Sequence, residues 1–452
     1  MVAACPFPAN HGSAASIREM SEALVKLGHT VHVMTYPIQE DIPVLEGVCI
    51  HRVNLPFIKP GKVIVGPSYL KFLYDPLMII KSLRIILKFK IDVIHAHNYE
   101  GAIIGWVGKT LTRRPMLYNA VNSMADELPG YNFIKPRVLA VWLGRLLDKL
   151  VPHAGNVVTV VSDALKDFLV LQGVAAQIIR VVPAGVNLDM FAAGDGDRIK
   201  IKHGLSSKTP LVVYTGAFEA FQRIDYLLKA MQRVLLFRPD AYLLLAGSVY
   251  NPEASGRFKA MAKELGIEKN VIFIEAVPLP ELTDYLAAAD VTVVPRPECP
   301  GHPVKLLNYM AAGKATVSFK GGAKGLHHMY NGYLVEDHDA DGLGDGIIFL
   351  LEHEHLRLAI AAKARATIVG NFDWDTLAKG IAILYQRMLE GKTNLEGVPE
   401  LDRHIRNSYV LSYVDRRCAG GNQYREQRSG AERRKNYVPI TILERRKVSF
   451  ER

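Results

Sequence analysis

Short apolar runs alternate with amphipathic stretches along most of this sequence, and this alternation limits the folds open to the chain. Five apolar runs in the first 190 residues have the β-rich composition of buried strands, at 29–36, 91–98, 115–121, 156–162 and 178–186. Between them, residues 14–27, 101–111 and 135–150 repeat apolar residues at the three- and four-residue spacing of helices. Such an alternation of strands and helices predicts a parallel sheet covered by helices.

The same alternation begins again after Phe191. Residues 192–210 are rich in glycine and charge, which is typical of a linker, and the next strand is expected at 211–218. Further strands are expected at 241–247, 270–276, 290–295 and 315–319. The sequence therefore predicts an α/β fold of two doubly wound, Rossmann-like domains with a ligand cleft between them.

The expected domain boundaries follow from these patterns. We expect an N-terminal domain at residues 1–192 and a C-terminal domain at 193–372. A helical stretch at 373–391 is expected to close the globular part and to pack back on the N-terminal domain. Residues 392–452 show little periodicity and carry pairs of arginines, which is typical of a mobile basic tail.

The formal net charge of +10 is unevenly distributed along the chain. Residues 401–452 hold 13 Lys and Arg against 6 Asp and Glu, so this part carries +7 and the rest of the chain only +3. The body of the protein is therefore close to balanced in charge. Because the basic tail has neither an aromatic platform nor a known nucleic-acid-binding module, we expect no nucleic-acid partner.

Cysteine usage and the first residues indicate the cytoplasm. The four cysteines lie far apart, which argues against a zinc site or a disulfide framework and suits a reducing compartment. The N-terminus lacks the basic start and apolar stretch of a signal peptide. The most apolar helical segment, 77–89, is interrupted by three basic residues and is too short to cross a bilayer, so we expect no transmembrane span.

Residues 295–319 are the strongest candidate for a functional site. A buried strand ends at Pro295, a proline-rich loop follows, and residues 304–312 are expected to form a compact helix closed by Gly313. The free N–H groups of the first turn of this helix would offer a phosphate site at the cleft, to which Lys305 adds a mobile positive charge. The alternative interpretation is an ordinary strand–helix–strand crossover with a solvated lysine.

Together with this cluster, three segments resemble the retaining glycosyltransferases of family 4, which have the GT-B fold. These segments are VVPAGVNLDMF at 181–191, LVVYTGAFEAFQ at 211–222 and MAAGKATV at 310–317, in the family's order and spacing. The resemblance covers about residues 1–390. It implies that the C-terminal domain holds a nucleotide-sugar donor and the N-terminal domain an acceptor, and that the configuration of the transferred sugar is retained.

The implied activity is that of a hexosyltransferase acting on a hydroxyl group of a glycan or a lipid-linked acceptor. The resemblance implies neither a metal ion nor another cofactor. Because several family residues are replaced in this sequence, a second interpretation stays open. In that interpretation, the chain is a catalytically silent relative that binds a nucleotide sugar or a glycan as a scaffold or sensor.

The first replacement concerns the family's two glutamates, which are separated by seven residues. Their positions fall on Pro300 and Asn308 in this sequence, so neither carboxylate is present. The Asn308 amide can still bind ribose hydroxyls. Glu298, two residues before Pro300, could replace the other carboxylate only if the loop is displaced.

The second replacement concerns an arginine and a lysine that clamp the diphosphate in the family. Their positions fall on Ala217 and Gln222, and both charges are lost, although Gln222 is a polar replacement and remains a donor-binding candidate. The nearest cations are Arg223, Lys305 and Arg296, and we expect at least one of them to reach the diphosphate because charge-assisted hydrogen bonds are strong. For Arg223, the alternative is a solvated residue at a helix start.

Most other donor-binding candidates are backbone positions at expected strand ends and helix starts. They are Gly12, Ser13, Gly216, Gly301, His302, Pro303 and Val304. Gly12 and Ser13 belong to the turn between the first strand and the first helix, where a glycine lets the backbone approach a ligand. A plain tight turn is the alternative interpretation there.

In the N-terminal domain, the position at which many relatives carry a histidine that contacts the donor sugar is Val121. An apolar side chain cannot do the polar work of an imidazole. Asn119 and Asn122, on either side of it, are the candidates to take over part of that role.

His97, Asn98 and Glu100 are further candidates at the rim of the cleft. His95 and His97 would point to one face of their strand, but no carboxylate or third histidine accompanies them at a familiar spacing, so we expect no metal site. Hydrogen bonding at the cleft and structural packing both remain open for these imidazoles.

Residues 56–90 combine apolar and basic side chains, with Asp75 as their single acidic residue. Relatives that glycosylate lipid carriers dock on the membrane through such a surface, so the resemblance implies a peripheral contact with the inner face of the membrane as one interpretation. A core-facing amphipathic helix with a solvated basic edge explains residues 76–90 equally well.

Overall fold

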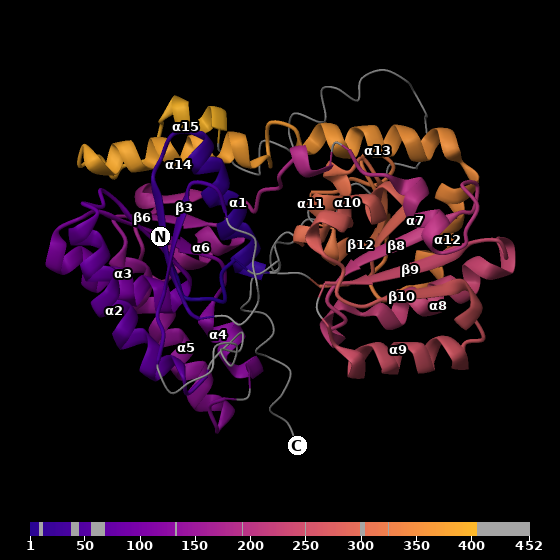
Figure 1. Ribbon diagram of the computed structural model, residues 1–452, viewed down its shortest axis with the longest axis horizontal. Coiled ribbons are helices and arrows are strands. Elements are labelled where there is room, and N and C mark those ends of the chain that lie inside the picture. The colour runs from indigo at the N-terminus through magenta and orange to yellow at the C-terminus, as the bar shows by residue number, and fades with distance from the viewer. Residues whose placement is uncertain are drawn as a thin grey trace, which may run out of the picture. The chain divides into compact units, whose positions relative to one another are not determined.

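The computed structural model describes residues 1–8, 12–37, 45–55, 68–131, 133–191, 193–248, 250–298, 303–323 and 325–404 (Figure 1). Residues 1–407 form one compact unit. Of the predicted basic tail at 392–452, residues 405–452 lie outside the described residues, whereas residues 392–404 are described and bury Leu395, Val398 and Leu401. Among the helices that are described, none combines the length and the apolar character that crossing a membrane requires.

Seven strands of the described chain form the N-terminal sheet, and all neighbouring strands run parallel. Their order is β3-β2-β1-β4-β5-β6-β7. Their bounds are β1 Val2–Ala3, β2 Val31–Thr35, β3 Val48–Arg52, β4 Ile94–His97, β5 Met116–Ala120, β6 Val157–Val160 and β7 Ile179–Val181. The chain reverses its direction of travel across the sheet between β1 and β4, which is the switch point at which open α/β sheets bind ligands.

Helices cover both faces of this sheet. Those that precede the linker are α1 Gly12–Lys26, α2 Lys71–Lys88, α3 Asn98–Thr112, α4 Met124–Glu127, α5 Arg137–Leu150 and α6 Asp163–Leu171. Two C-terminal helices, α14 Trp374–Leu389 and α15 Pro399–His404, join α1 on one face and share an apolar cluster with it. Helices α2, α3 and α6 bury the other face in a second cluster. The sheet is therefore buried on both sides, as its continuous apolar strands require.

Six further described strands form a second parallel sheet, in the order β10-β9-β8-β11-β12-β13. Their bounds are β8 Leu211–Gly216, β9 Tyr242–Gly247, β10 Val271–Ile274, β11 Val291–Val294, β12 Ala315–Phe319 and β13 Tyr333–Val335. The switch point of this sheet lies between β8 and β11.

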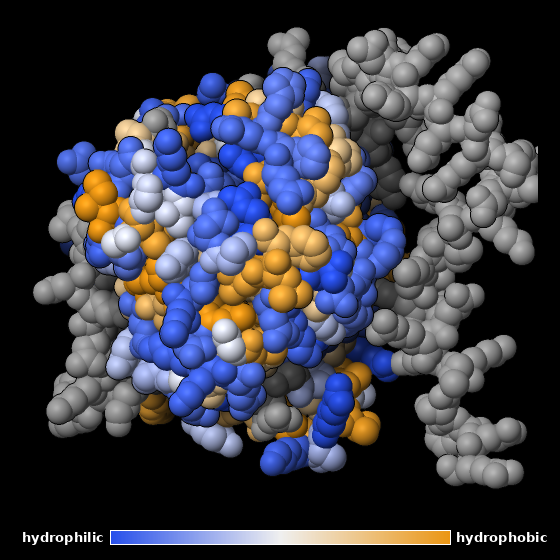
Figure 2. Space-filling view, turned by 90° about the vertical axis from the view of Figure 1, so that its right-hand side faces the viewer, coloured by the Kyte–Doolittle hydropathy of each residue, from blue (hydrophilic) through white to orange (hydrophobic). Residues whose placement is uncertain are grey.

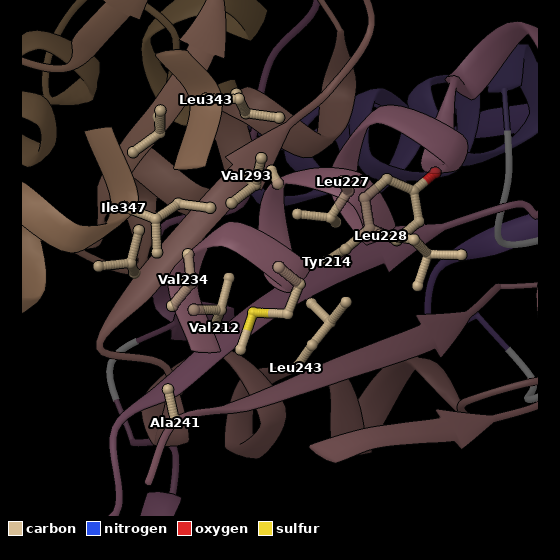
Figure 3. Close-up of a cluster of buried hydrophobic side chains, with 14 of the residues drawn as sticks. Val212, Tyr214, Leu227, Leu228, Val234, Ala241, Leu243, Val293, Leu343 and Ile347 are labelled. Atoms are coloured by element: carbon tan, nitrogen blue, oxygen red, sulfur yellow. The ribbon is translucent and has the colours of Figure 1, made fainter. Parts of the chain in front are cut away.

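The helices of the second sheet build a continuous apolar core with it. They are α7 Gly196–Lys202, α8 Ile224–Phe237, α9 Pro252–Glu264, α10 Leu279–Ala288, α11 Val304–Ala311, α12 Ala340–Glu352 and α13 Glu354–Ile368. On the outer side of this region, apolar residues form separate patches among polar ones (Figure 2). In the core, Val212 and Leu243 from the sheet pack with Leu228 of α8 and Leu343 of α12, and the Tyr214 hydroxyl lies at the border of the cluster (Figure 3).

The predicted fold class of two parallel, Rossmann-like α/β domains is confirmed. Each of the ten predicted strand ranges contains a strand, and the three predicted N-terminal helices correspond to α1, α3 and α5. The prediction missed two edge strands, β3 and β13. Strand β3 reads VCIHR and ends in polar residues, and β13 has only three residues, so neither produces the apolar run that marks an inner strand.

A buried carboxylate joins three helices beside the end of β5. Asp148 of α5 is fully buried and accepts hydrogen bonds from the N–H groups of Met124 and Ala125 at 2.8 and 2.9 Å, and from the Ser123 hydroxyl at 3.1 Å. The Tyr99 hydroxyl of α3 also donates to this carboxylate. Helix α4 has no side-chain cap of its own, so Asp148 supplies the acceptor that its first turn needs.

We expect Asp148→Ala to lower the free energy of unfolding by about 3 kcal/mol, because several buried donors lose a charged acceptor at once. Chemical denaturation of the full chain measures the change. The matched control is Asp126→Ala on α4, whose side chain is exposed, and its effect should stay within about 0.5 kcal/mol. Equal stabilities of the two variants would show that Asp148 does not hold these helices together.

Candidate functional site

The carboxyl ends of β8 and β11 separate from each other. The two strands pair only at Val212–Val291 and Val213–Thr292, near their amino ends. On its other side, β8 stays paired with β9 as far as Gly216. On the side that faces β11, the carboxyl end of β8 therefore has no paired strand. This side is the switch point of the sheet, where a ligand is expected in an open α/β sheet.

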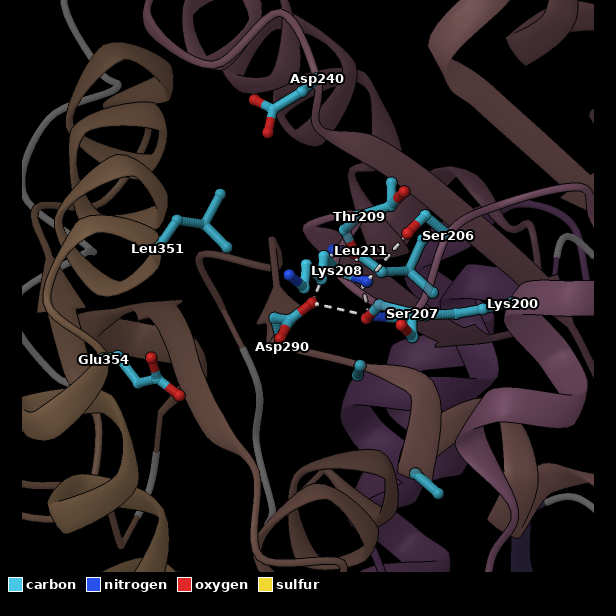
Figure 4. Close-up of polar contacts among 12 residues, drawn as sticks. Lys200, Ser206, Ser207, Lys208, Thr209, Leu211, Asp240, Asp290, Leu351 and Glu354 are labelled. Atoms are coloured by element: carbon cyan, nitrogen blue, oxygen red, sulfur yellow. Dashed lines mark hydrogen bonds and ion pairs between the residues drawn. The ribbon is translucent and has the colours of Figure 1, made fainter.

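Asp290 closes the amino end of the same strand pair. Its Oδ2 accepts hydrogen bonds from the Leu211 N–H at 2.9 Å and from Lys200 Nζ at 3.4 Å, and its own N–H donates to the Leu211 carbonyl at 2.9 Å (Figure 4). Lys200 is buried and also donates to the carbonyl oxygens of Ser207 and Thr209, both at 2.9 Å. These contacts fix the end at which β8 and β11 stay together.

Tyr309 of α11 occupies the open end in place of a strand. Its hydroxyl accepts a hydrogen bond from the Thr215 N–H of β8 at 2.7 Å. The side chain is fully buried, and burial raises the pKa of Tyr309 to about 12, so the hydroxyl stays protonated. Because a buried backbone N–H needs a partner, this tyrosine fixes α11 against the end of β8.

Lys305 lies in the first turn of α11 and reaches the end of β8. Its Nζ donates to the Tyr214 hydroxyl and to Gln222 Oε1, both at 2.7 Å, and stands 4.0 Å from the centre of the Tyr214 ring. Helix α11 begins after Pro303 and has no side-chain cap. The structure therefore brings Lys305, Gln222 and the Val304 end of α11 together, at a helix N-terminus that favours an anion.

Gly216 ends β8 directly beside this lysine. Its φ is +139°, in the range that favours glycine, and a Cβ at this position would lie 2.8 Å from Lys305 Nζ. Any side chain at residue 216 would therefore displace the lysine from the end of β8.

Arg223 is committed to a local ion pair. It has a left-handed φ of +55° between a 3-10 turn, η5 Ala220–Gln222, and helix α8. Its Nε and a terminal nitrogen pair with the two carboxylate oxygens of Asp225 at 2.9 and 2.8 Å, and its guanidinium stacks 4.0 Å from the Tyr226 ring centre. The hydrogen bonds to Asp225 raise the pKa of Arg223 above its usual range. A role at the diphosphate would require Arg223 to give up this pair.

The other C-terminal candidates lie close in sequence to the end of β11 or on α11. Arg296 stands 5.0 Å from the Phe221 ring centre and forms no ion pair with another described residue. Glu298 is exposed and Asn308 is half-buried, and neither side chain hydrogen-bonds to the part of the chain that is described. Gly301 and His302 lie outside the described residues.

In the N-terminal sheet, His97 ends β4 and belongs to a buried polar row. Its Nδ1 lies 3.3 Å from Asn119 Nδ2, and Asn119 Oδ1 accepts from the Thr159 hydroxyl at 3.3 Å. The ring stacks on His95 with centroids 4.2 Å apart, and His95 Nδ1 lies 2.7 Å from the Tyr385 hydroxyl. Burial lowers the pKa of His97 to about 3, so the imidazole is neutral near pH 7. His97 Nε2 is buried without a hydrogen-bond partner among the described residues, so packing and hydrogen bonding both stay open for His97.

The starts of α1 and α3 meet at the switch point of this sheet. Gly12 is the first residue of α1, and the Ser13 hydroxyl lies 3.4 Å from Asn98 Oδ1. Asn98 begins α3 with a left-handed φ of +61°. Glu100 does not face a ligand freely, because its Oε1 accepts from Lys71 Nζ at 2.6 Å. Ser13 and Asn98 are thus the predicted residues that the structure brings together here.

Asn122 follows β5, and its carbonyl oxygen lies 3.2 Å from the Tyr99 hydroxyl. Its side-chain amide makes no hydrogen bond to another described residue. Within the described ranges, no group of three or more His, Cys, Asp or Glu side chains is placed to hold a metal ion.

Tyr214 and Tyr309 position the lysine and the end of β8, and neither was expected from the sequence. Both lie among apolar residues, in YTG and NYM, so hydropathy assigns them to the core. Their rings are indeed buried, and they act at the site through both hydroxyl groups and through the face of the Tyr214 ring. A tyrosine in a run that otherwise contains aliphatic residues is the one signal that could have indicated them.

Two family models match this chain. Residues 11–190 match the model described as Glycosyltransferase Family 4, and residues 195–367 match the model described as Glycosyl transferases group 1. The D-inositol 3-phosphate glycosyltransferase of Thermobispora bispora is 24% identical over 388 residues, which cover 83% of this chain and 89% of that protein.

Solved structures share the fold at low sequence identity. Sucrose-phosphate synthase from Thermosynechococcus elongatus has a TM-score of 0.71 at 20% identity, covering 86% of this chain and 98% of that one. HepE from Anabaena in complex with UDP and glucose has a TM-score of 0.63 at 19% identity, covering 85% and 98%. The architecture of two parallel sheets is therefore one that glycosyltransferase structures share.

The buried imidazole of His97 predicts that stability falls in acid. Its pKa is about 3 in the folded chain and near 6.5 when unfolded, so between these values the unfolded chain binds more protons. The contribution of His97 is present above pH 6.5 and declines as the pH falls towards 3, by up to about 1.4 kcal/mol per pH unit. His97→Gln should reduce the slope of unfolding free energy against pH, whereas His355→Gln on the exposed side of α13 should leave it unchanged. Equal slopes in the wild type and His97→Gln would contradict the assignment.

Proposed function

We propose that this chain transfers a hexose from a nucleotide-sugar donor to a hydroxyl group. The premise is that the chain is a glycosyltransferase, made of a Glycosyltransferase Family 4 domain and a Glycosyl transferases group 1 domain. The acceptor in this proposal is a glycan or a lipid-linked saccharide. The observation that carries the donor part is the position of Lys305, in the first turn of α11 beside the open end of β8. HepE, a structural neighbour, has been solved with UDP-glucose.

The donor diphosphate would lie at the N-terminus of α11. The helix dipole and the first-turn N–H groups favour negative charge there, and Lys305 Nζ adds a cation that Tyr214 and Gln222 already hold in place. The Asn308 side chain, one turn further along α11, would bind the ribose hydroxyls. Arg296 is the second candidate cation for the diphosphate, because its guanidinium forms no ion pair with a described residue.

The same groups would act on the chemical step. When the bond between the anomeric carbon and the donor phosphate breaks and the bond to the acceptor oxygen forms, negative charge develops on the leaving diphosphate. Lys305 and the α11 amides are oriented before the reaction, so they stabilise this charge without reorganisation. Retention of configuration and independence from a metal ion are part of the proposal, and they follow from the resemblance to the family.

The rival function is binding without transfer, and particular observations favour it. The positions of the two family glutamates hold Pro300 and Asn308, and that of the family's histidine holds Val121. Arg223, one of the substitute cations, is paired with Asp225. Multiple turnovers with any donor and acceptor would reject this rival, whereas nucleotide-sugar binding without transfer would support it.

We also propose that the N-terminal domain contacts the inner face of the cytoplasmic membrane. Large apolar side chains are exposed on α2, α3 and α5, and α2 packs against α3. They include Trp106 at 50% exposure and Trp142 at 59%, with Arg145 and Lys149 exposed on the same helix as Trp142. Tryptophan and basic side chains are the residues that favour the interface of an anionic membrane.

Calorimetric titration with UDP, GDP and ADP tests the donor site. We expect at least one of these nucleotides to bind, and Lys305→Met to weaken its binding by about 10- to 100-fold, since a charge-assisted hydrogen bond contributes roughly 1.5–3 kcal/mol. Lys229→Met, an exposed lysine of α8, is the control and should leave the affinity unchanged. If none of the three nucleotides binds at millimolar concentration, the proposed donor site is wrong.

Sedimentation with vesicles tests the membrane contact. We expect the double variant Trp106→Ser/Trp142→Ser to partition to anionic vesicles about 30-fold more weakly than the wild type, because each ring withdrawn from the interface removes about 1 kcal/mol. Leu236→Ser/Phe237→Ser is the matched control, since both residues are exposed on α8 of the other sheet. A wild type that stays in the supernatant would contradict the contact.

A further inference from the structure

A groove lies at the outer edge of the N-terminal sheet. The end of the edge strand β3 and the residues after it form one wall, and the C-terminal half of α2 forms the other. Its volume of about 520 Å³ is within the range of small-molecule sites. Strand β2 separates β3 from β1, so the groove does not belong to the switch point between β1 and β4.

The groove is strongly and uniformly positive. Arg52, Lys81, Arg84 and Lys88 line it, and no acidic residue is among the described residues that form its walls. None of the four forms an ion pair with any residue that the structure describes. At the other end of α2, by contrast, Lys71 is paired with a glutamate at 2.6 Å. The charges of the groove are therefore available to a ligand.

Arg52 indicates that this ligand is an anion. Its Nε is buried without a hydrogen-bond partner among the described residues, and burial lowers the pKa of its guanidinium. Lys81 Nζ donates to the Arg52 carbonyl oxygen, which fixes the backbone but leaves Arg52 Nε without an acceptor among the described residues. A buried polar group without a partner is unfavourable, and an anionic oxygen would supply the missing acceptor.

Apolar side chains alternate with these cations along α2. Leu77, Ile80 and Ile85 line the groove, and Phe89 closes its end directly after the helix. Ile80 is 49% exposed, so a good part of this apolar surface is open to a ligand. The stripe thus presents hydrocarbon and positive charge at helical spacing, which matches a molecule with an anionic head and an apolar chain.

We propose that this groove is a second ligand site, which binds a phosphate group carried on an aliphatic chain. Arginine and lysine match the charge and the acceptor oxygens of a phosphate, and the apolar wall of α2 would cover the first part of the chain. A nucleic acid would bring phosphates but no aliphatic chain, so it would leave the apolar wall of α2 uncovered. The site goes beyond the proposed transfer reaction, because a chain without transferase activity would still bind such a ligand.

His51 provides a local reporter at the rim. Its Nε2 lies 3.0 Å from His32 Nδ1, and its ring centre lies 5.6 Å from that of Phe89. Burial lowers the pKa of His51, and neighbouring His32, Lys81 and Lys88 lower it further. A phosphate bound among these cations acts in the opposite direction and raises the pKa of His51.

Calorimetry of the full chain with decyl phosphate, below its micelle concentration, tests the site directly. We expect saturable binding that weakens by about tenfold or more in Lys81→Gln/Arg84→Gln, because two of the four cations are removed. The control is Arg257→Gln/Lys263→Gln, which removes the same charge from the exposed surface of α9. Circular dichroism with thermal unfolding verifies that both variants fold. Equal weakening in both variants would overturn the proposal.

Two further probes test separately what the phosphate group and the aliphatic chain contribute to binding. Inorganic phosphate and the neutral amphiphile decyl maltoside should each bind at least about tenfold more weakly than decyl phosphate, because each lacks one half of the match. Equal binding of inorganic phosphate would reduce the groove to a general anion site, and equal binding of decyl maltoside would reduce it to an apolar patch. Either result contradicts the proposal.

Nuclear magnetic resonance of the histidine side chains locates the ligand. With His51→Gln as the assignment variant, we expect decyl phosphate to raise the pKa of His51 by about one unit. An unchanged pKa with intact binding would place the ligand elsewhere. Binding to vesicles of an anionic phospholipid without any binding of monomeric decyl phosphate would replace the discrete site with a contact to the bilayer surface, and it would overturn the proposal.

Discussion

The structure of the candidate donor site depends on one strand pair that is closed at its amino end and open at its carboxyl end. Asp290 bonds to the first residue of β8 at the closed end, and the Tyr309 hydroxyl bonds to the Thr215 N–H at the open end. Because the hydroxyl satisfies a backbone group that a strand would otherwise pair, α11 lies against the end of β8. Its first turn therefore delivers Lys305 beside Gly216, where a side chain would block it.

The residues that replace the family pattern are organised around this lysine. Gln222 stands where the resemblance expects a cation, and its amide oxygen accepts from Lys305 Nζ at 2.7 Å. The side chain of residue 222 therefore orients the positive charge of Lys305, which belongs to α11, and supplies no charge of its own. Tyr214 does the same from β8. A positive charge oriented by two hydrogen bonds and a ring face is preorganised for an anion, so the loss of the clamp does not by itself argue against the proposed phosphate site.

The sequence predicted the two sheets well because inner parallel strands need continuous apolar runs. It missed the edge strands β3 and β13 because β3 ends in polar residues and β13 has only three residues, so neither forms such a run. It also indicated Lys305 and Gln222. It could not show that Arg223 is bound by Asp225, since that pair depends on the left-handed φ of Arg223. Nor could it show that His97 faces Asn119, because the register of neighbouring strands cannot be read from either strand alone.

The two positive regions of the molecule differ in how their charges are held, and this difference bears on what each one selects. Lys305 Nζ is held by hydrogen bonds to the Tyr214 hydroxyl and Gln222 Oε1, which suits the proposed binding of one diphosphate in one orientation. In the groove, the side chains of Arg84 and Lys88 have no such hydrogen-bond partners among the described residues, and they alternate with hydrocarbon. Flexible cations beside an apolar wall select amphiphiles as a class and discriminate little between individual compounds. The groove is therefore expected to select a ligand by the charge of its headgroup and by its aliphatic chain. The end of β8 is expected to select a ligand by the position and orientation of its diphosphate.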